Sequence, residues 1–242
     1  MKVDVKQDYD QMSLYTANEI LKYVSQKPNS LLCFAAGSTP IGTFKYLAAL
    51  AQEQNVSFAN CSFVGLDEWV GLDKTVYGSC YEMLYRDFFN PMGIRPSQLE
   101  FFDATSDDLQ NECKRMDEYL LTQGPIDLIL LGIGVNGHLG FNEPGEDFDS
   151  LCHLTTLNDI TISVGQKYFK EHKKLGQGIT LGMRHIMNSD TVLLIASGDN
   201  KAHVIHQMLH EKVTEELPAS LLQNHPQCHV ILDHAAAQWA NK

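Results

Sequence analysis

The sequence predicts an α/β fold in which a mostly parallel sheet is covered by helices on both faces. Short, continuously apolar runs recur along the chain, and stretches with helical periodicity separate them. Strands buried on both faces of a parallel sheet are apolar throughout, and alternation of strand and helix is typical of such sheets. The 242 residues, 44% of them hydrophobic, suffice for one domain with a substantial core.

The expected strands and helices alternate along most of the chain. The strands are the apolar runs Leu31–Ala36, Cys61–Leu66, Ile126–Ile133, Thr191–Ser197 and Cys228–Leu232. The helices are Ile41–Gln52 after the first strand, Asp107–Leu121 before the third and Lys201–His210 after the fourth. In such sheets ligands bind at the carboxyl ends of the strands. Residues that carry chemistry are therefore expected directly after the apolar runs.

The segment from about Glu146 to Gly178 breaks this pattern. It is polar and weakly periodic, and it contains the stretch KYFKEHKKLGQG. Such a segment inside a compact domain is often a lid or binding loop, although a solvated surface helix with flanking loops fits the same composition. No linker-like stretch divides the chain, so we expect a single domain over residues 1–242 with a lid at about 146–178.

Composition and charge exclude several classes of function. The formal net charge of −12 argues against nucleic acid and anionic membrane surfaces as partners. No stretch approaches the ~20 apolar residues of a membrane span, and the polar N-terminus lacks the apolar core of a signal peptide. The six cysteines show neither a CxxC pair nor metal-ligand spacing. We therefore expect a cytoplasmic protein without disulfides.

The first motif, Ala36-Gly37-Ser38-Thr39-Pro40, follows the first expected strand and precedes a helix. Gly37 allows a tight turn, Ser38 and Thr39 offer hydroxyls, and Pro40 suits a first helical turn. Free N–H groups and the helix dipole at such a position favour a phosphate. An ordinary capped turn between strand and helix explains the same residues.

Two adjacent carboxylates, Asp67 and Glu68, follow the second expected strand in the sequence LDEW. A partly buried carboxylate with a raised pKa is a usable general base. A role as helix N-cap also suits Asp67. The residues alone leave both roles open.

The third motif is the loop GIGVNGHLGFNEPG at residues 132–145, directly after the apolar stretch IDLILLGI. Its glycines let the backbone approach a ligand closely. His138 and Glu143 lie in this loop, and a His held by a carboxylate suits proton transfer near neutral pH. A fourth motif, Gly198-Asp199-Asn200-Lys201, follows the fourth strand, where Lys201 is either a phosphate-binding cation or a solvated lysine.

Together the motifs AGSTP, LDEWVGL, GIGVNGHLGFNEPG and GDNKA resemble the glucosamine-6-phosphate deaminase/isomerase family. They stand in the family's order and span essentially the whole chain. The resemblance implies a Rossmann-like α/β fold and a reaction without metal or cofactor. An amino sugar phosphate is ring-opened and isomerised, and the resulting imine is hydrolysed to a ketose phosphate and ammonia. The resemblance therefore implies an isomerase and deaminase that also counts as a hydrolase.

The resemblance also implies roles for individual residues. Asp67 corresponds to the base that moves a proton from carbon 2 to carbon 1, and His138 corresponds to the ring-opening acid/base. Glu143 and Asn136 correspond to the relay partners of His138. The implied contacts to the phosphate and the rest of the substrate are Gly37, Ser38, Thr39, Glu68, Gly137, Lys167 and Lys201.

The lid departs from the family pattern. GEDFDSLCHLTTL stands where many members carry an S-R-T-type stretch, and the nearest lid cation is Lys167, which lacks the bidentate geometry of an arginine. The features LDEW, NEPGE, CH and GITLG resemble the galactosamine-6-phosphate branch. We therefore expect conversion of either galactosamine-6-phosphate to tagatose-6-phosphate or glucosamine-6-phosphate to fructose-6-phosphate, with the branch features favouring the first. The chain ends soon after the last expected strand, so we predict neither allosteric control nor a hexamer and expect a monomer or homo-oligomer.

Two other functions suit parts of the same pattern. A 6-phosphogluconolactonase has a related G-x-[DN]-G-H loop, but it continues with a T-A-S-L-F-P-like stretch where this chain has LGFNEPG. A non-catalytic sugar-phosphate-sensing domain shares the fold, but such domains are typically attached to a DNA-binding helix-turn-helix. The net charge does not suit DNA. A third alternative is a catalytically inactive member of the same family, which the sequence does not distinguish from an active enzyme.

Overall fold

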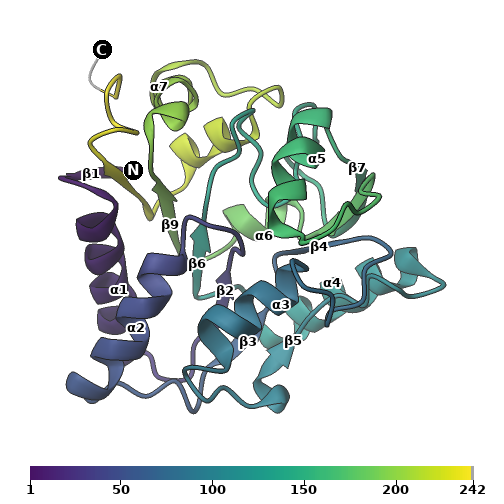
Figure 1. The fold of residues 1–242 in the computed structure, drawn as a ribbon, viewed down its shortest axis with the longest axis horizontal. Helices are drawn as coiled ribbons and strands as arrows, with labels where there is room; N and C mark the ends of the chain where they lie inside the picture. Colours follow the sequence, from purple (N-terminus) through teal and green to yellow (C-terminus); the bar gives the residue numbers. More distant parts are fainter. Residues whose placement is uncertain (241–242) are drawn as a thin grey trace.

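Two sheets organise the chain, and the larger one lies at its centre (Figure 1). The computed structural model describes residues 1–240. Seven strands form the larger sheet in the order β1-β10-β9-β6-β2-β3-β5, and each neighbouring pair is parallel. Three strands form a smaller antiparallel sheet in the order β4-β8-β7. The α/β fold with a mostly parallel sheet, expected from the sequence, is confirmed.

The strands of both sheets are short. They are β1 (Lys2–Lys6), β2 (Leu31–Phe34), β3 (Ser62–Val64), β4 (Asp67–Trp69), β5 (Leu99–Glu100), β6 (Leu128–Leu131), β7 (His153–Thr156), β8 (Gln177–Thr180), β9 (Thr191–Ala196) and β10 (Cys228–Asp233). The α-helices are α1 (Tyr9–Gln26), α2 (Ile41–Glu53), α3 (Cys80–Leu84), α4 (Leu109–Gln123), α5 (Asp159–Gly165), α6 (Met183–Met187) and α7 (Ala202–His210). Shorter helical turns are η1 (Tyr85–Phe89), η2 (Pro96–Gln98), η3 (Gln166–Tyr168), η4 (Asp199–Lys201) and η5 (Pro218–Asn224).

Two hydrophobic clusters bury the faces of the larger sheet. Successive residues of a strand point to opposite faces, so Leu32 and Phe34 join one cluster while Leu31 and Cys33 join the other. The first cluster is covered by α1, α2 and η1, and the second by α4, α6, α7 and η5. Both faces of the sheet are therefore buried, which explains why its central strands read as continuous apolar runs.

The strand order reverses between β2 and β6. From β2 the chain moves outward to β3 and β5, and it then returns to β6 on the other side of β2. Phe34 of β2 pairs with Leu130 of β6, so both strands end at the same edge. The loops that follow them carry the motifs of residues 36–40 and 132–145. A reversal of this kind opens a crevice at the carboxyl ends of the strands, where ligands bind in open α/β sheets.

The small sheet and α5 lie together beside this edge (Figure 1). The segment of residues 146–178 contributes β7, α5 and η3, and β7 pairs with β8, which pairs in turn with β4. The segment is therefore more ordered than its weak sequence pattern indicated. Its role as a lid and the extent of the single domain stay predictions.

Several elements were not foreseen from the sequence. They are β1, α1, β5 and the whole small sheet. The LDEW motif follows β3, as expected, and Asp67–Trp69 in addition forms β4. A three-residue strand has too little sequence for alternation to be recognised, and its pairing with β8 is made across more than 100 residues.

Two further observations bear on composition. No helix within residues 1–240 combines the length and the apolar character needed to cross a membrane. All six cysteines lie within this part of the chain, and each is buried and unpaired.

Candidate active site

A cavity of about 350 Å³ opens at the carboxyl edge of the larger sheet. The loops after β2, β6 and β9 form its floor, and α5 and η3 from the lid segment form part of its wall. Of the residues singled out in the sequence, the cavity is lined by Gly37, Ser38, Thr39, Asp67, His138, Lys167 and Lys201. The chain reversal at β2 and β6 thus brings groups from all four motifs to one place.

The loop after β2 forms one end of the cavity. Gly37 adopts a φ of +103°, a conformation that favours glycine, and a Cβ there would lie 3.1 Å from the Tyr168 hydroxyl. Ser38 and Thr39 line the cavity directly ahead of α2. The 13-residue helix α2 begins at Ile41 without a side-chain cap, so the positive end of its dipole faces this loop.

Two lysines lie at the same end. Lys201 Nζ donates a hydrogen bond to the backbone carbonyl of Ile133 at 2.6 Å. Because this carbonyl is neutral, the bond does not neutralise the positive charge of the ammonium group. Burial, together with the charge of nearby Lys167, lowers the pKa of Lys201 to about 8. An anion would reverse this effect because it stabilises the charged ammonium. The lysine pair and the end of α2 thus give this end of the cavity a local positive charge in an otherwise acidic protein.

Asp67 is the first residue of β4 and is 9% exposed. Burial raises its pKa to about 6, although a hydrogen bond from the Cys80 thiol and the charge of His138 oppose the shift. A Cβ on Gly140 would lie 3.4 Å from Oδ2 of Asp67, so the glycine lets the loop approach the carboxylate. A carboxylate with a pKa near 6 is ionised at neutral pH and basic enough to accept a proton from carbon.

His138 lies on the cavity wall and is held by three neighbours. Its Nδ1 lies 3.1 Å from the Thr161 hydroxyl and 3.6 Å from Oε2 of Glu143. The ring also rests against Gly134, where a Cβ would lie 2.5 Å from Cε1 of His138. These contacts fix the orientation of the imidazole, which a proton-transferring His requires.

Glu143 lies behind His138 and is 6% exposed. Burial alone would raise its pKa, but hydrogen bonds and the charge of His138 outweigh burial and lower the pKa to about 2. Oε2 accepts from Asn136 Nδ2 at 2.8 Å, and Oε1 accepts from the backbone N–H of Asn158 at 3.1 Å. Asn136 Oδ1 in turn accepts from the backbone N–H of His138 at 3.3 Å. Asn136 and Glu143 therefore support His138 from outside the cavity.

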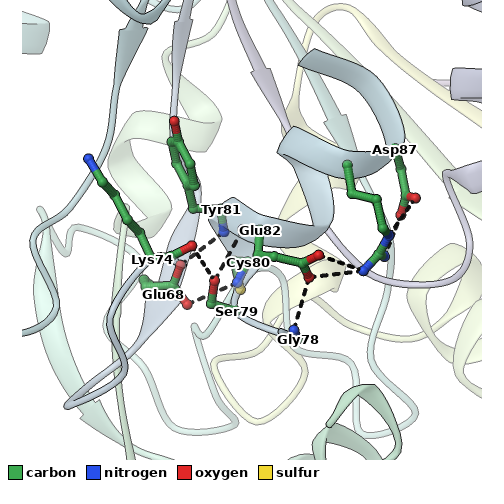
Figure 2. Close-up of polar contacts among 9 residues, drawn as sticks. Glu68, Lys74, Gly78, Ser79, Cys80, Tyr81, Glu82 and Asp87 are labelled. Carbon is green, nitrogen blue, oxygen red and sulfur yellow. Dashed lines mark hydrogen bonds and ion pairs between the residues drawn. The ribbon is translucent and has the colours of Figure 1, made fainter. Parts of the chain in front are cut away.

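Glu68 does not line the cavity, unlike its neighbour. Figure 2 shows its carboxylate turned toward the start of α3, where it accepts from the N–H groups of Cys80 and Tyr81 at 2.9 Å each. Burial raises the pKa of Glu68 to about 7. Adjacent residues of a strand point to opposite faces, which explains why Asp67 lines the cavity and Glu68 does not. Glu68 therefore caps the start of α3 in this structure, and its expected substrate contact stays a prediction.

Gly137 also lies outside the cavity. Its φ is +86°, and a Cβ there would lie 2.2 Å from Cδ1 of Leu217. Its carbonyl accepts from the N–H of Ala219 at 3.0 Å. Gly137 therefore shapes the loop against η5, and its expected substrate contact stays a prediction.

The cavity is also lined by residues outside the candidate set, among them Trp69, Cys80, Thr161 and Tyr168. Cys80 lies against Asp67 through its thiol. Thr161 and Tyr168 come from the lid segment, and their position depends on how that segment folds back. The run DEWVGL offered a signal for Trp69, but the other three side chains carry no pattern that a single sequence displays.

The chain matches the model of a family described as glucosamine-6-phosphate isomerases/6-phosphogluconolactonase over residues 4–231. It is 35% identical to the glucosamine-6-phosphate deaminase of Thermoanaerobacter pseudethanolicus, over 98% of this chain and 94% of that protein. It is 36% identical to glucosamine-6-phosphate deaminase 1 of Bacillus subtilis, over 98% of both chains.

Solved structures give a matching result. A monomeric glucosamine-6-phosphate deaminase superposes with a TM-score of 0.96 at 36% identity, over 99% of this chain and 100% of the other. The 6-phosphogluconolactonase of Trypanosoma brucei superposes with a TM-score of 0.78 at 20% identity, over 98% and 97% of the two chains, and shares the fold. The expected classification as a hydrolase is wrong, because the more similar relatives are named deaminases.

Proposed function

Because the chain belongs to the family of glucosamine-6-phosphate isomerases and 6-phosphogluconolactonases, we propose that it isomerises and deaminates a 2-amino-2-deoxyhexose 6-phosphate. The observation that carries this proposal is the pairing of two proton-transfer groups on one cavity. Asp67 has a pKa of about 6, and His138 is held by Thr161 and Glu143. Ring opening and proton transfer between carbons require two such groups.

The phosphate is proposed to bind between the start of α2 and the lysine pair. Backbone N–H groups of the loop at 37–39 and the helix dipole suit a dianion. Lys201 adds a positive charge, and Lys167 from η3 adds a second one from the lid side. This arrangement anchors the sugar at one end of the cavity and leaves its carbon 1 and carbon 2 free to reach Asp67.

The first proposed step is ring opening. His138 transfers a proton between the ring oxygen and the hydroxyl at carbon 1, and the closed sugar becomes an open-chain aldehyde. Glu143 is ionised at neutral pH because its pKa is about 2. Its negative charge stabilises the protonated imidazole during the transfer, as an adjacent carboxylate does for a catalytic His.

The second proposed step moves a proton from carbon 2 to carbon 1. The Asp67 carboxylate takes the proton from carbon 2, the electron pair forms an enediol-type intermediate, and the same carboxyl returns a proton to carbon 1. The amino group then remains on carbon 2 as an imine. Water adds to that carbon and ammonia leaves, which gives a ketose phosphate.

Glucosamine-6-phosphate is the proposed substrate, with fructose-6-phosphate and ammonia as products. The relatives that are 35–36% identical over nearly their whole length are named glucosamine-6-phosphate deaminases. The galactosamine branch suggested by LDEW and the CH pair has no named relative among them. We further propose that the enzyme is a cytoplasmic monomer, as the relative with a TM-score of 0.96 is described as monomeric.

One assay series tests this function. The purified chain is incubated separately with glucosamine-6-phosphate, galactosamine-6-phosphate and 6-phosphogluconolactone, and ammonia and lactone opening are measured. We expect ammonia from glucosamine-6-phosphate at the higher kcat/KM. Faster ammonia release from galactosamine-6-phosphate would reassign the sugar. Lactone opening without ammonia from either sugar would replace the proposed reaction by that of a lactonase.

A further inference from the structure

A second group of reactive side chains lies outside the cavity, where three segments meet. Asp117 lies on α4, Cys152 directly precedes β7, and His185 lies on α6. One carboxylate oxygen, the thiol sulfur and one imidazole nitrogen lie within 4.8 Å of one another. Among residues 1–240 this is the one group in which three such ligand atoms converge.

The contacts within this group centre on Asp117. Its Oδ1 accepts from His185 Nε2 at 2.7 Å and from the backbone N–H of Cys152 at 3.0 Å. The Cys152 thiol also hydrogen-bonds to the Asp117 carboxylate. Because the His185 and backbone bonds end on Oδ1, Oδ2 can coordinate a cation.

A second thiol, Cys113, lies in the same region but outside the group of three converging ligand atoms. Cys113 lies one helical turn before Asp117 on α4, so both side chains project from the same face of the helix. It is 3% exposed and lies near enough to Cys152 for the two thiols to influence each other electrostatically. The converging donors are therefore one sulfur, one imidazole and one carboxylate, which zinc takes in tetrahedral sites when water fills the fourth position.

We propose that Asp117, Cys152 and His185 bind a thiophilic divalent cation of the Zn²⁺ type. Zinc places neighbouring ligand atoms about 3.3–3.7 Å apart. The three ligand atoms, which lie within 4.8 Å of one another, must move by no more than about 1.5 Å to reach this spacing. The side chains of Asp117 and His185 are 22% and 14% exposed, so a cation can enter from solvent.

A cation at this position would connect the lid segment to the catalytic strand. Cys152 is followed by His153, which pairs with Thr180 of β8, and Thr180 pairs with Asp67 of β4. The same segment carries Thr161 and Lys167 to the cavity wall. The bound cation therefore holds the small sheet and the lid base on α4 and α6, in addition to the existing hydrogen bonds.

Cobalt titration of the reduced, full-length chain tests the site, because a thiolate bound to Co²⁺ gives a charge-transfer absorption in the near ultraviolet. We expect one Co²⁺ per chain, this absorption, and its loss when Zn²⁺ is added. Zn²⁺ is also expected to raise the melting temperature. Absence of binding, or binding without the thiolate absorption, would overturn the proposal and leave a hydrogen-bonded network only.

Conservative variants separate ligation from hydrogen bonding. Cys152→Ser and His185→Gln keep donors toward Asp117 but remove good zinc ligands, so both are expected to lose the absorption and the Zn²⁺-dependent thermal shift. Cys61→Ser is the matched control, since Cys61 belongs to the cluster on the opposite face of the sheet and its thiol bonds to the carbonyl of Pro28. Retention of the absorption in either ligand variant overturns the assignment, and if one variant does not fold, the other gives the result.

Discussion

Replacing Asp67 by Asn removes the proposed base while keeping the shape of its side chain. A positioned general base contributes about 10²–10⁴-fold to a rate, so we expect kcat to fall by at least about a hundredfold. The phosphate contacts of the lysine pair and the loop at 37–39 lie at the other end of the cavity. Binding of the sugar phosphate is therefore expected to change little.

The same substitution should make the folded chain more stable at neutral pH. The pKa of Asp67 is raised from 3.8 to about 6 in the folded chain. The folded state therefore holds a proton that the unfolded chain loses between about pH 4 and pH 6, and stability falls as pH rises through this window. The difference of about two pKa units corresponds to roughly 3 kcal/mol. Asp67→Asn removes this cost, so we expect a gain of up to that size above pH 6 and none below pH 4.

Two measurements check both expectations on one variant. Steady-state ammonia release gives kcat, and urea unfolding at pH 7.5 and pH 3.5 gives the free energy of unfolding. Asp107→Asn is the matched control, because Asp107 is exposed and lies outside the cavity. Near-normal turnover of Asp67→Asn would refute the assignment of the base. Equal stability of wild type and variant at both pH values would refute the burial of a charged carboxylate.

Four other substitutions give independent expectations. His138→Gln should slow turnover of the closed-ring substrate more than that of an open-chain analogue, and equal losses in initial-rate kinetics would argue against ring opening by His138. Lys201→Met should raise KM about 10–100-fold at similar kcat, because a hydrogen bond to a charged group contributes about 1.5–3 kcal/mol; an unchanged KM would contradict the phosphate site. Cys80→Ala removes the thiol that lowers the pKa of Asp67, so the acidic limb of the pH profile of kcat/KM should move to higher pH. Cys80→Ser is the control and should leave this limb near its original position. Superimposable pH profiles for Cys80→Ala and wild type would exclude this role of the thiol. Gly137→Ala should lower the free energy of unfolding by about 1–3 kcal/mol, since its φ is +86° and the new Cβ meets Leu217. Gly93→Ala is the control, because its φ is +65° but the space around it is open, and it should lower the free energy of unfolding by less in urea titrations. Equal losses for the two variants would show that the contact with Leu217 contributes nothing.

The central part of the fold could be predicted from the sequence because both faces of the larger sheet are buried. The run Ile126–Ile133, for example, contains β6 at Leu128–Leu131, with its four residues buried. The edge strands β1 and β5 lack such a signal. β1 (Lys2–Lys6) alternates charged residues with valines over only five positions, and β5 has two residues. Edge and very short strands depend on pairing partners that local periodicity does not reveal.

Parts of the site were harder to predict for the same reason. Asp67 and Glu68 are equivalent as sequence letters, and only the strand geometry of β4 sends one to the cavity and the other to α3. The roles of Thr161 and Tyr168 depend on how the lid segment folds onto the sheet. The cluster of Asp117, Cys152 and His185 shows no metal-like spacing because its members come from three distant segments.

The proton transfer from carbon 2 to carbon 1 can be followed directly with glucosamine-6-phosphate deuterated at carbon 2. We expect ammonia and fructose-6-phosphate in equal amounts, with deuterium lost from carbon 2 and found at carbon 1 or in the solvent by NMR. The Asp67→Asn variant should leave the label in place. Ammonia released by wild type into a product that still carries deuterium at carbon 2 would contradict isomerisation through Asp67.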